Sequence, residues 1–201
     1  MATPHEFGKL LSEIRGCRFC DGLPLGANPL LQASPSAKIL IAGQAPGRRA
    51  HHNSVPFDDS SGDRLRDWLG INREVFYDPA FIAIVPMGFC FPGSGQRGDL
   101  PPRRECADLW RTKLLSKMPD IRLTVLIGMY AQRWHLPQGT SGNLADNTRN
   151  WRKFWPSTVI LPHSSPRNAA WLKNNPHVES EILPALRRRV QELLASATGA
   201  D

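Results

Sequence analysis

Hydrophobic residues follow two spacings along the chain, one typical of helices and the other of buried strands. Residues 6–15 carry apolar side chains at intervals of three and four, which predicts a first helix. Four short apolar runs, each ending in or followed by glycine or proline, predict buried strands. These runs lie at 37–43, 81–85, 123–128 and 158–161. Further helices are predicted at 63–69, 103–118, 129–135, 169–173 and from 178 to about 194. Continuous apolar strands that alternate with helices are typical of an α/β fold, in which helices cover both faces of a parallel sheet.

Segments rich in proline and glycine follow three of these strands. They span 43–62, 86–102 and 162–168. Because ligands bind at the carboxyl ends of the strands in parallel sheets, these three loops are predicted to form the functional site. Neither a repeat nor an interdomain linker interrupts the pattern, so the 201 residues are expected to form a single domain, 1–201.

The composition of the chain indicates its cellular location and the class of its binding partner. Hydrophobic residues make up 41% of the chain, as in ordinary globular proteins, and no apolar run approaches the ~20 residues that span a bilayer. The first residues lack the basic-then-apolar pattern of an export signal, so a cytoplasmic protein without membrane contact is expected. The net charge of +7 favours a polyanionic partner, nucleic acid first, although a merely soluble basic surface would give the same excess.

The four cysteines carry the clearest chemical signal. Cys17 and Cys20 are close in sequence, whereas Cys90 and Cys106 lie far along the chain and well apart. Thiolates spaced in this way can converge on one soft metal centre, either a tetrahedral zinc or an iron–sulfur cluster. Two disulfides would need an oxidising compartment, and a zinc ribbon usually has two close pairs, so an iron–sulfur cluster is favoured over structural zinc. Unligated thiols, buried as small hydrophobic groups, remain an alternative.

Two of the predicted site loops have signals of their own. The loop after the first strand begins Gly43-Gln44-Ala45-Pro46-Gly47, a turn that alone is weak evidence. The loop after the last strand reads Pro162-His163-Ser164-Ser165-Pro166-Arg167-Asn168. Its hydroxyls and backbone amides suit phosphate oxygens, and its arginine adds positive charge. Ser164 or Ser165 could equally cap the helices that follow.

Taken together, these segments resemble the paired motifs of the uracil-DNA glycosylase superfamily. The resemblance rests on Gly43 to Gly47, on the Pro56-Phe57 step with the following Ser61-Gly62, and on the loop from His163 to Asn168. The cysteine spacing, Asn175-Pro176 and the last helix are similar to the iron–sulfur branch, the bacterial and archaeal thermostable types. The resemblance implies a four-stranded parallel sheet between helices, a 4Fe–4S cluster on the four cysteines, and hydrolysis of the N-glycosidic bond of uracil in DNA.

The resemblance also implies roles for individual residues on the base side of that bond. An enzyme that acts on a base inside a duplex must flip the base out and stack it on an aromatic ring. Phe57 matches the stacking phenylalanine of the family, and with Gly43 and Ala45 it is expected to line the base pocket. His163 lies at the matching histidine and is suited to donate a hydrogen bond to the departing base.

Breaking the bond through an oxocarbenium-like sugar needs a nearby negative charge and a positioned water. The family's motif position for the water falls on Gln44, whose amide orients water but cannot take its proton. Asp59 matches an aspartate of one thermophilic subfamily and is favoured as the charge that positions water and supports the cation. Asp58 is the alternative in the same loop, and a solvated turn is the other interpretation of both aspartates.

One position departs from the family. Pro86 stands four residues before the third cysteine, where many members have an asparagine that reads the edge of uracil. Proline has neither a backbone donor nor a side-chain amide. Base recognition is therefore expected from backbone groups around Gly88 and Phe89, and related deaminated bases become candidate substrates. His51 and His52 are predicted to lie in an exposed loop and to contact phosphate.

These signals predict a monofunctional DNA glycosylase that acts as a monomer on single- or double-stranded DNA and leaves an abasic site. The DNA-binding residues are expected in the last loop, at Ser164, Ser165, Arg167 and Asn168. The three site loops contain no lysine, which argues against a lyase, because that chemistry needs an amine nucleophile. Two other classes stay open: a non-catalytic binder of damaged DNA with the same fold, and an enzyme on a nucleoside or another small N-glycoside.

Overall fold

A four-stranded parallel sheet forms the centre of the computed structural model, which describes residues 4–96, 98–138, 140 and 142–198. The strands stand in the order β2-β1-β5-β6. Their bounds are Ile39–Ala42 for β1, Ile82–Ile84 for β2, Leu123–Ile127 for β5 and Thr158–Leu161 for β6. The predicted α/β fold is confirmed, and each strand lies within the apolar run predicted for it.

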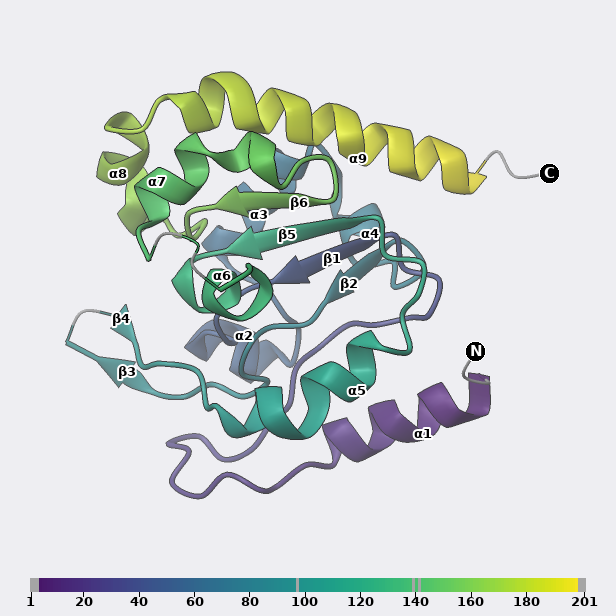
Figure 1. Cartoon of the computed structure of the whole chain (residues 1–201). Helices are drawn as coiled ribbons and strands as arrows, with labels where there is room; N and C mark the ends of the chain where they lie inside the picture. The colour runs from purple at the N-terminus through teal and green to yellow at the C-terminus, as the bar shows by residue number, and fades with distance from the viewer. Residues whose placement is uncertain (1–3, 97, 139, 141, 199–201) are drawn as a thin grey trace.

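Helices cover both faces of the sheet because successive strand side chains point to opposite sides. Ile39 and Ile41 of β1 pack with α3 and α9, whereas Leu40 packs on the other side with α1 and α5. These helices span Pro4–Arg15 (α1), Ser60–Leu69 (α3), Thr112–Leu115 (α5) and Leu183–Thr198 (α9). In Figure 1, α9 lies above the sheet and α1 and α5 lie below it, which gives three layers.

Shorter helices and single turns complete the layers. Their bounds are Arg48–Asn53 (α2), Arg73–Phe76 (α4), Met129–His135 (α6), Leu144–Arg149 (α7), Ala169–Lys173 (α8), Ala107–Arg111 (η1), Trp151–Lys153 (η2), Pro166–Asn168 (η3) and Val178–Ile182 (η4). The helices predicted at 129–135 and 169–173 are confirmed at both ends. Periodicity did not predict α2, α4 and α7, because such short helices show too few repeats of the pattern. None of the described helices is long and apolar enough to cross a membrane.

The first helix begins at Pro4, two residues before its predicted start, and the segment predicted from 178 to about 194 consists of η4 followed by α9, which extends to Thr198. Two further helices also differ from their predicted bounds. The segment predicted as a helix at 103–118 is helical only from 105 to 115 and contains the π-helical turn η1. The helix predicted from residue 63 begins earlier, at Ser60. It does so because the Asp59 carboxylate accepts hydrogen bonds from the backbone amides of Ser61 and Gly62 and thereby caps the helix.

A two-stranded antiparallel hairpin stands beside the carboxyl ends of the sheet strands (Figure 1). It consists of β3 (Ser94–Gly95) and β4 (Gly98–Asp99), and residue 97 lies outside the described residues. Its sequence contains glycines but none of the β-branched or aromatic residues typical of strands, so sequence analysis did not predict it. Gly98 and Asp99 bring this hairpin to the loops that follow β1 and β6.

Candidate functional site

A cleft of about 550 Å³ opens at the carboxyl ends of the sheet strands. Its lining comes from residues within the segments 43–50, 56–61, 98–99 and 163–168, without Arg49, Asp58 and Ser164, and from Ile84 and Pro86. The three loops predicted to form a site therefore meet in space. They meet because all four strands run parallel and end at the same edge of the sheet.

His163 lies on the wall that follows β6, and one hydrogen bond determines the tautomer of its ring. The backbone amide of Ser165 donates to His163 Nδ1 at 3.1 Å. Nδ1 therefore carries no proton, so the neutral ring holds its proton on Nε2. Burial lowers the pKa of His163, against the raising effect of the Asp59 and Asp99 charges. The ring is consequently neutral at neutral pH and offers an N–H donor without a full positive charge.

The Asp59 carboxylate caps α3 with one oxygen and leaves the other beside Gly47. Oδ1 accepts hydrogen bonds from the amides of Ser61 at 2.9 Å and Gly62 at 3.0 Å. Oδ2 lies 3.6 Å from the position that a Cβ on Gly47 would take. Both Asp59 and Gly47 line the cleft, so the backbone of α3 holds a negative charge in place there.

The ring of Phe57 forms part of the cleft lining. Its Cζ atom lies 3.2 Å from the position that a Cβ on Gly43 would take. Phe76 packs against the Phe57 ring in a T-shaped arrangement, with ring centroids 6.3 Å apart. The ring is thus held by its neighbours and only partly buried, as a platform for a stacked base must be.

Gln44 also lines the cleft, but its side-chain nitrogen is engaged. Nε2 donates a hydrogen bond to the carbonyl of Leu100 at 2.8 Å and lies 3.5 Å from the carbonyl of Asp99. The amide therefore fastens the hairpin to the loop after β1. Only Oε1 is left for the predicted role of holding water.

The loop after β6 is held in shape by its own polar groups. Asn168 Nδ2 donates to the carbonyl of His163 at 2.7 Å, and Ser165 Oγ accepts from the amide of Arg167 at 3.3 Å. Arg64 of α3 donates to the Ser165 carbonyl at 3.2 Å, which ties the loop to the opposite wall. Ser165, Arg167 and Asn168, three of the four predicted DNA-binding residues, line the cleft.

Ser164 and Phe89 require correction, because burial keeps both side chains from the cleft. Ser164 is 0% exposed, so its hydroxyl cannot reach a DNA phosphate. Phe89 is 1% exposed and packs in the core with residues of α1 and α5. Its backbone is also engaged, since its amide donates to Cys106 Sγ at 3.5 Å and its carbonyl accepts from Leu30 at 2.7 Å.

The segment after β2 presents an apolar surface to the cleft at Pro86. The Pro86 carbonyl accepts a hydrogen bond from the buried guanidinium of Arg111 at 2.7 Å. The amide of Gly88 donates to the carbonyl of Gln44 at 2.9 Å, and Gly88 lies outside the cleft lining. The amides of Gly88 and Phe89 and the carbonyl of Phe89 are therefore engaged elsewhere, which corrects the expectation that these groups read a base.

Asp58 lies outside the cleft lining and has two partners of its own. Asn53 Nδ2 donates to one of its oxygens at 2.8 Å, and Arg73 forms a salt bridge with the other at 2.9 Å. The hydrogen bonds from Asn53 and Arg73 lower the pKa of Asp58. Of the two adjacent aspartates, Asp59 is the one that lines the cleft.

The two histidines expected in an exposed loop lie instead in α2. His51 is only 9% exposed, and its ring centroid lies 6.3 Å from that of Phe91, so burial removes it from phosphate contact. His52 is exposed. Arg48, at the start of the same helix, lines the cleft and supplies a positive charge there.

Asp99 lines the cleft, although sequence analysis did not select it. Its Oδ2 atom lies 3.6 Å from the Cβ position of Gly47, the same separation as for Asp59 Oδ2. The residue belongs to no motif of the resemblance, and the hairpin that carries it was not predicted. The only available signal was an acidic residue in a proline- and glycine-rich loop after a strand.

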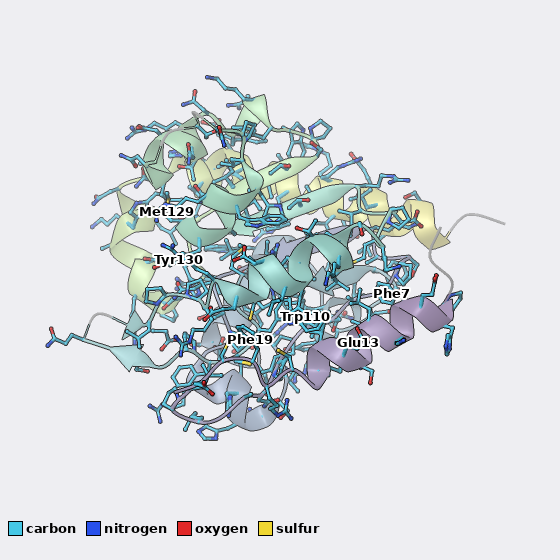
Figure 2. The ribbon with its side chains drawn as sticks, turned by 60° about the horizontal axis from the view of Figure 1, so that its bottom comes forward. Phe7, Glu13, Phe19, Trp110, Met129 and Tyr130 are labelled. Atoms are coloured by element: carbon cyan, nitrogen blue, oxygen red, sulfur yellow. The ribbon has the colours of Figure 1, made fainter. Side chains whose placement is uncertain are left out.

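The four cysteines line one small cavity, although they come from segments far apart in the sequence. Phe19 and Trp110, which Figure 2 shows on the same side of the molecule, line it as well. Burial raises the pKa of the Cys90 thiol and raises that of Cys106 to about 12. Within the described part of the chain, no group of three or more His, Cys, Asp or Glu side chains is arranged to hold a metal ion. The donor set itself, four thiols in apolar surroundings with a backbone amide donating to one sulfur, fits a soft metal centre.

Comparison with known proteins places this fold and cleft in a family. The model of the Uracil DNA glycosylase superfamily matches residues 32–187. The chain belongs to this superfamily, which supports a DNA-glycosylase-like function with DNA as the substrate. A candidate uracil DNA glycosylase from Methanosarcina acetivorans, solved in solution by NMR, is 19% identical, with a TM-score of 0.46. That similarity covers 80% of this chain and 98% of the other. The family match contains every segment of the cleft, whereas Cys17 and Cys20 precede it.

Proposed function

We propose that the protein is a monofunctional DNA glycosylase that hydrolyses the N-glycosidic bond of uracil, and of related deaminated bases, in DNA. One observation carries this proposal: a single cleft contains the aromatic ring of Phe57, the neutral imidazole of His163 and the carboxylate of Asp59. These are the groups that stacking a flipped base, releasing it as an anion and supporting a sugar cation require.

His163 acts on the base. As the C1′–N bond breaks, its electron pair moves onto the base, which needs a hydrogen-bond donor to carry the charge. The neutral ring donates from Nε2, because the amide of Ser165 already occupies Nδ1. Burial favours this neutral donor over an imidazolium.

Asp59 acts on the sugar. Positive charge develops at C1′ as the bond lengthens, and a carboxylate held by two backbone amides stabilises it without having to reorient. Water then attacks C1′ and leaves an abasic site. No lysine is among the residues described as lining the cleft, so the proposal includes no strand cleavage by an amine nucleophile.

Pro86 widens the expected range of bases. The residue offers the cleft no donor, and its carbonyl is bound by Arg111. A pocket without a side-chain amide at this position has less power to reject a base that differs from uracil at its polar edge. Hypoxanthine and xanthine are therefore included with uracil.

DNA binding follows from the charges around the cleft. Arg48 of α2 and Arg167 of the loop after β6 both line it, and the whole chain carries a net charge of +7. Both guanidinium groups suit phosphate oxygens, which position the strand without reading its sequence. Single- and double-stranded DNA both belong to the proposed substrates.

The proposal includes a 4Fe–4S cluster on Cys17, Cys20, Cys90 and Cys106, with structural zinc as the alternative. The shared cavity and the all-thiol donor set support it. Its role is structural, because the cavity of the cysteines and the cleft have no lining residue in common among those described. The cluster would supply a cross-link between the segment after α1 and the segments that carry Cys90 and Cys106.

The decisive experiment uses oligonucleotides that each contain a single uracil, hypoxanthine or xanthine, in single- and double-stranded form. The protein should produce alkali-labile sites with uracil and with at least one other base, and borohydride should trap no protein–DNA adduct. Protein that binds these oligonucleotides but never produces alkali-labile sites would be a damaged-DNA binder. Protein without salt-dependent affinity for DNA would point to a small N-glycoside instead.

A further inference from the structure

Two carboxylates, not one, approach the same small space in the cleft. Asp59 Oδ2 and Asp99 Oδ2 each lie 3.6 Å from the point where a Cβ on Gly47 would stand. Both carboxylates also act electrostatically on the ring of His163. Asp99 therefore shares the surroundings of the two groups that the proposed reaction already uses.

The two carboxylates differ in what holds them. Asp59 Oδ1 accepts two backbone amides at the start of α3. Within the described part of the chain, Asp99 Oδ1 accepts one side-chain hydrogen bond, from the hydroxyl of Ser94 at 3.2 Å. Asp99 is exposed to solvent, whereas Asp59 is partly buried. A carboxylate with one weak donor and open access to water is the better placed of the two to accept a proton from water.

The hairpin that carries Asp99 is hydrogen-bonded to the loop after β1 and lies beside the loop after β6. Gln44, in the loop after β1, donates to the carbonyl of Leu100 at 2.8 Å. Arg167, in the loop after β6, has its Nη1 atom 3.2 Å from the Cβ position of Gly98. These contacts give Asp99 the defined position that a group acting on the reacting atoms needs.

An acidic side chain at this place is unfavourable for DNA binding. The chain has a net charge of +7, and Arg48 and Arg167 line the same cleft. A carboxylate among them repels the phosphates that the arginines attract. A role in the chemical step explains why a negative charge is placed here.

We propose that Asp99 is a second catalytic carboxylate, the base that activates the attacking water, an inference that rests on the glycosylase function proposed above. The C1′–N bond breaks with its electron pair on the base, the water oxygen bonds to C1′, and the proton of that water passes to the Asp99 carboxylate. Asp99 then releases the proton to solvent, and the base anion takes one from solvent. Asp59 supports the sugar cation, and Gln44 is a positioning residue that holds the hairpin.

Single-turnover excision by Asp99→Asn tests this division of work. Its rate should fall by about a hundredfold or more, the usual scale for a general base. Its affinity for DNA should be unchanged or higher, because a repelling charge is removed. Asp67→Asn, at an exposed carboxylate of α3, is the matched control and should react at the wild-type rate. In Asp99→Ala, added formate should restore part of the rate by replacing the missing carboxylate.

The outcomes separate this inference from the proposed function. An Asp99→Asn rate equal to that of the wild type overturns the inference and leaves the glycosylase proposal intact. A wild-type protein that excises none of the three bases overturns the glycosylase proposal and the role of Asp99 with it. Ser94→Ala keeps the carboxylate but removes the hydroxyl bound to it, so it should retain most of the rate. A loss as large as that of Asp99→Asn would attribute the effect to the hairpin and overturn the inference.

Discussion

His163 and His135 show that the hydrogen-bond partner, more than burial, determines what a histidine does in this protein. Burial lowers the pKa of both rings. At His163 the partner is a backbone amide on Nδ1, which leaves Nε2 as a donor. At His135 the partner is Arg111, whose Nη2 lies 2.7 Å from Nε2, so that nitrogen accepts. His163 therefore keeps an N–H donor for a ligand, whereas His135 accepts a hydrogen bond from the buried guanidinium of Arg111.

Replacing His163 with alanine should slow single-turnover excision by about a hundredfold or more, because the departing base loses its donor. Asp59→Asn should have an effect of similar size on the same step. Both variants should bind DNA nearly as well as the wild type, since each group acts mainly in the transition state. Excision rates of the wild type and of His163→Ala, measured from about pH 8 down to 6.5, test whether the His163 donor is neutral. A neutral donor gives a constant ratio of wild-type to His163→Ala rates, whereas an imidazolium donor would make that ratio fall as the pH rises.

The free energy of unfolding should decrease as the pH falls from 6.5 towards 3, in part because of His135. Burial, with a smaller contribution from the Arg111 charge, lowers the pKa of His135 to about 3 from 6.5. Between these values the unfolded chain binds a proton that the folded protein does not, so acid favours unfolding by at most about 1.4 kcal/mol per pH unit. His135→Gln keeps an acceptor for Arg111 but does not titrate. Denaturant titrations should show a shallower acid dependence for this variant, and equal slopes would contradict the assignment.

Single residues could be predicted where their chemistry is local and not where their position depends on distant contacts. Phe57, Asp59 and His163 were selected from motifs, and all three line the cleft. Ser164 has the same polarity as Ser165, yet only the folded chain shows that it is fully buried. Asp99 enters the cleft through a hairpin that Gln44 binds and that lies beside Arg167, and the residues next to Asp99 in sequence do not predict either neighbour.

At the scale of elements, the start of α3 is built around an unusually close approach of two backbone segments. Phe57 has a positive φ of 56°, a conformation that costs free energy for a residue with a side chain. A Cβ on Gly62 would lie 1.7 Å from the Phe57 carbonyl oxygen. Glycine at 62 therefore allows the turn that holds the Phe57 ring in the cleft and allows Asp59 to cap the helix.

Gly62→Ala should destabilise the protein and displace Phe57, because the added methyl group overlaps the backbone of the preceding turn. The loss should exceed about 1 kcal/mol in the free energy of unfolding, with a parallel loss of excision rate. Gly8→Ala is the matched control, since a Cβ there meets nothing within 4 Å and Gly8 lies in α1. That variant should be more stable by about 0.5–1 kcal/mol. Equal effects of the two substitutions would contradict this account.

The sequence predicted those elements whose own residues are apolar because the element is buried. Nearly every residue of the sheet strands is apolar, because helices cover both faces of the sheet. The hairpin at 94–99 has no such signature, since hydrogen bonds from Gln44 hold it to the loop after β1. The early start of α3 depends on the Asp59 cap, a polar contact that hydrophobic spacing does not register.

At the scale of the whole molecule, the cysteine cavity and the cleft lie on different parts of one α/β core. The cavity brings together the segment after α1, the segment after β2 and the start of η1. Because these segments are far apart in sequence, a cross-link between them closes long loops and strongly lowers the conformational entropy of the unfolded chain. We therefore expect the cluster to influence the stability of the N-terminal segment more than the chemistry in the cleft.

Protein purified without oxygen should be brown, with visible absorbance from thiolate bonds to iron. Cys90→Ser should remove the colour and lower the free energy of unfolding by about 2–5 kcal/mol, the scale of losing a covalent cross-link. Limited proteolysis should then cut first in the segment that carries Cys17 and Cys20, because that segment loses its attachment to the core. Asp21→Asn changes the same segment without removing a sulfur, so it should stay brown and resist the protease. Colourless wild-type protein that contains stoichiometric zinc, or no metal, would contradict the presence of the cluster. Proteolysis of Cys90→Ser that begins in the loops around the cleft would contradict the role of the cluster in attaching the N-terminal segment.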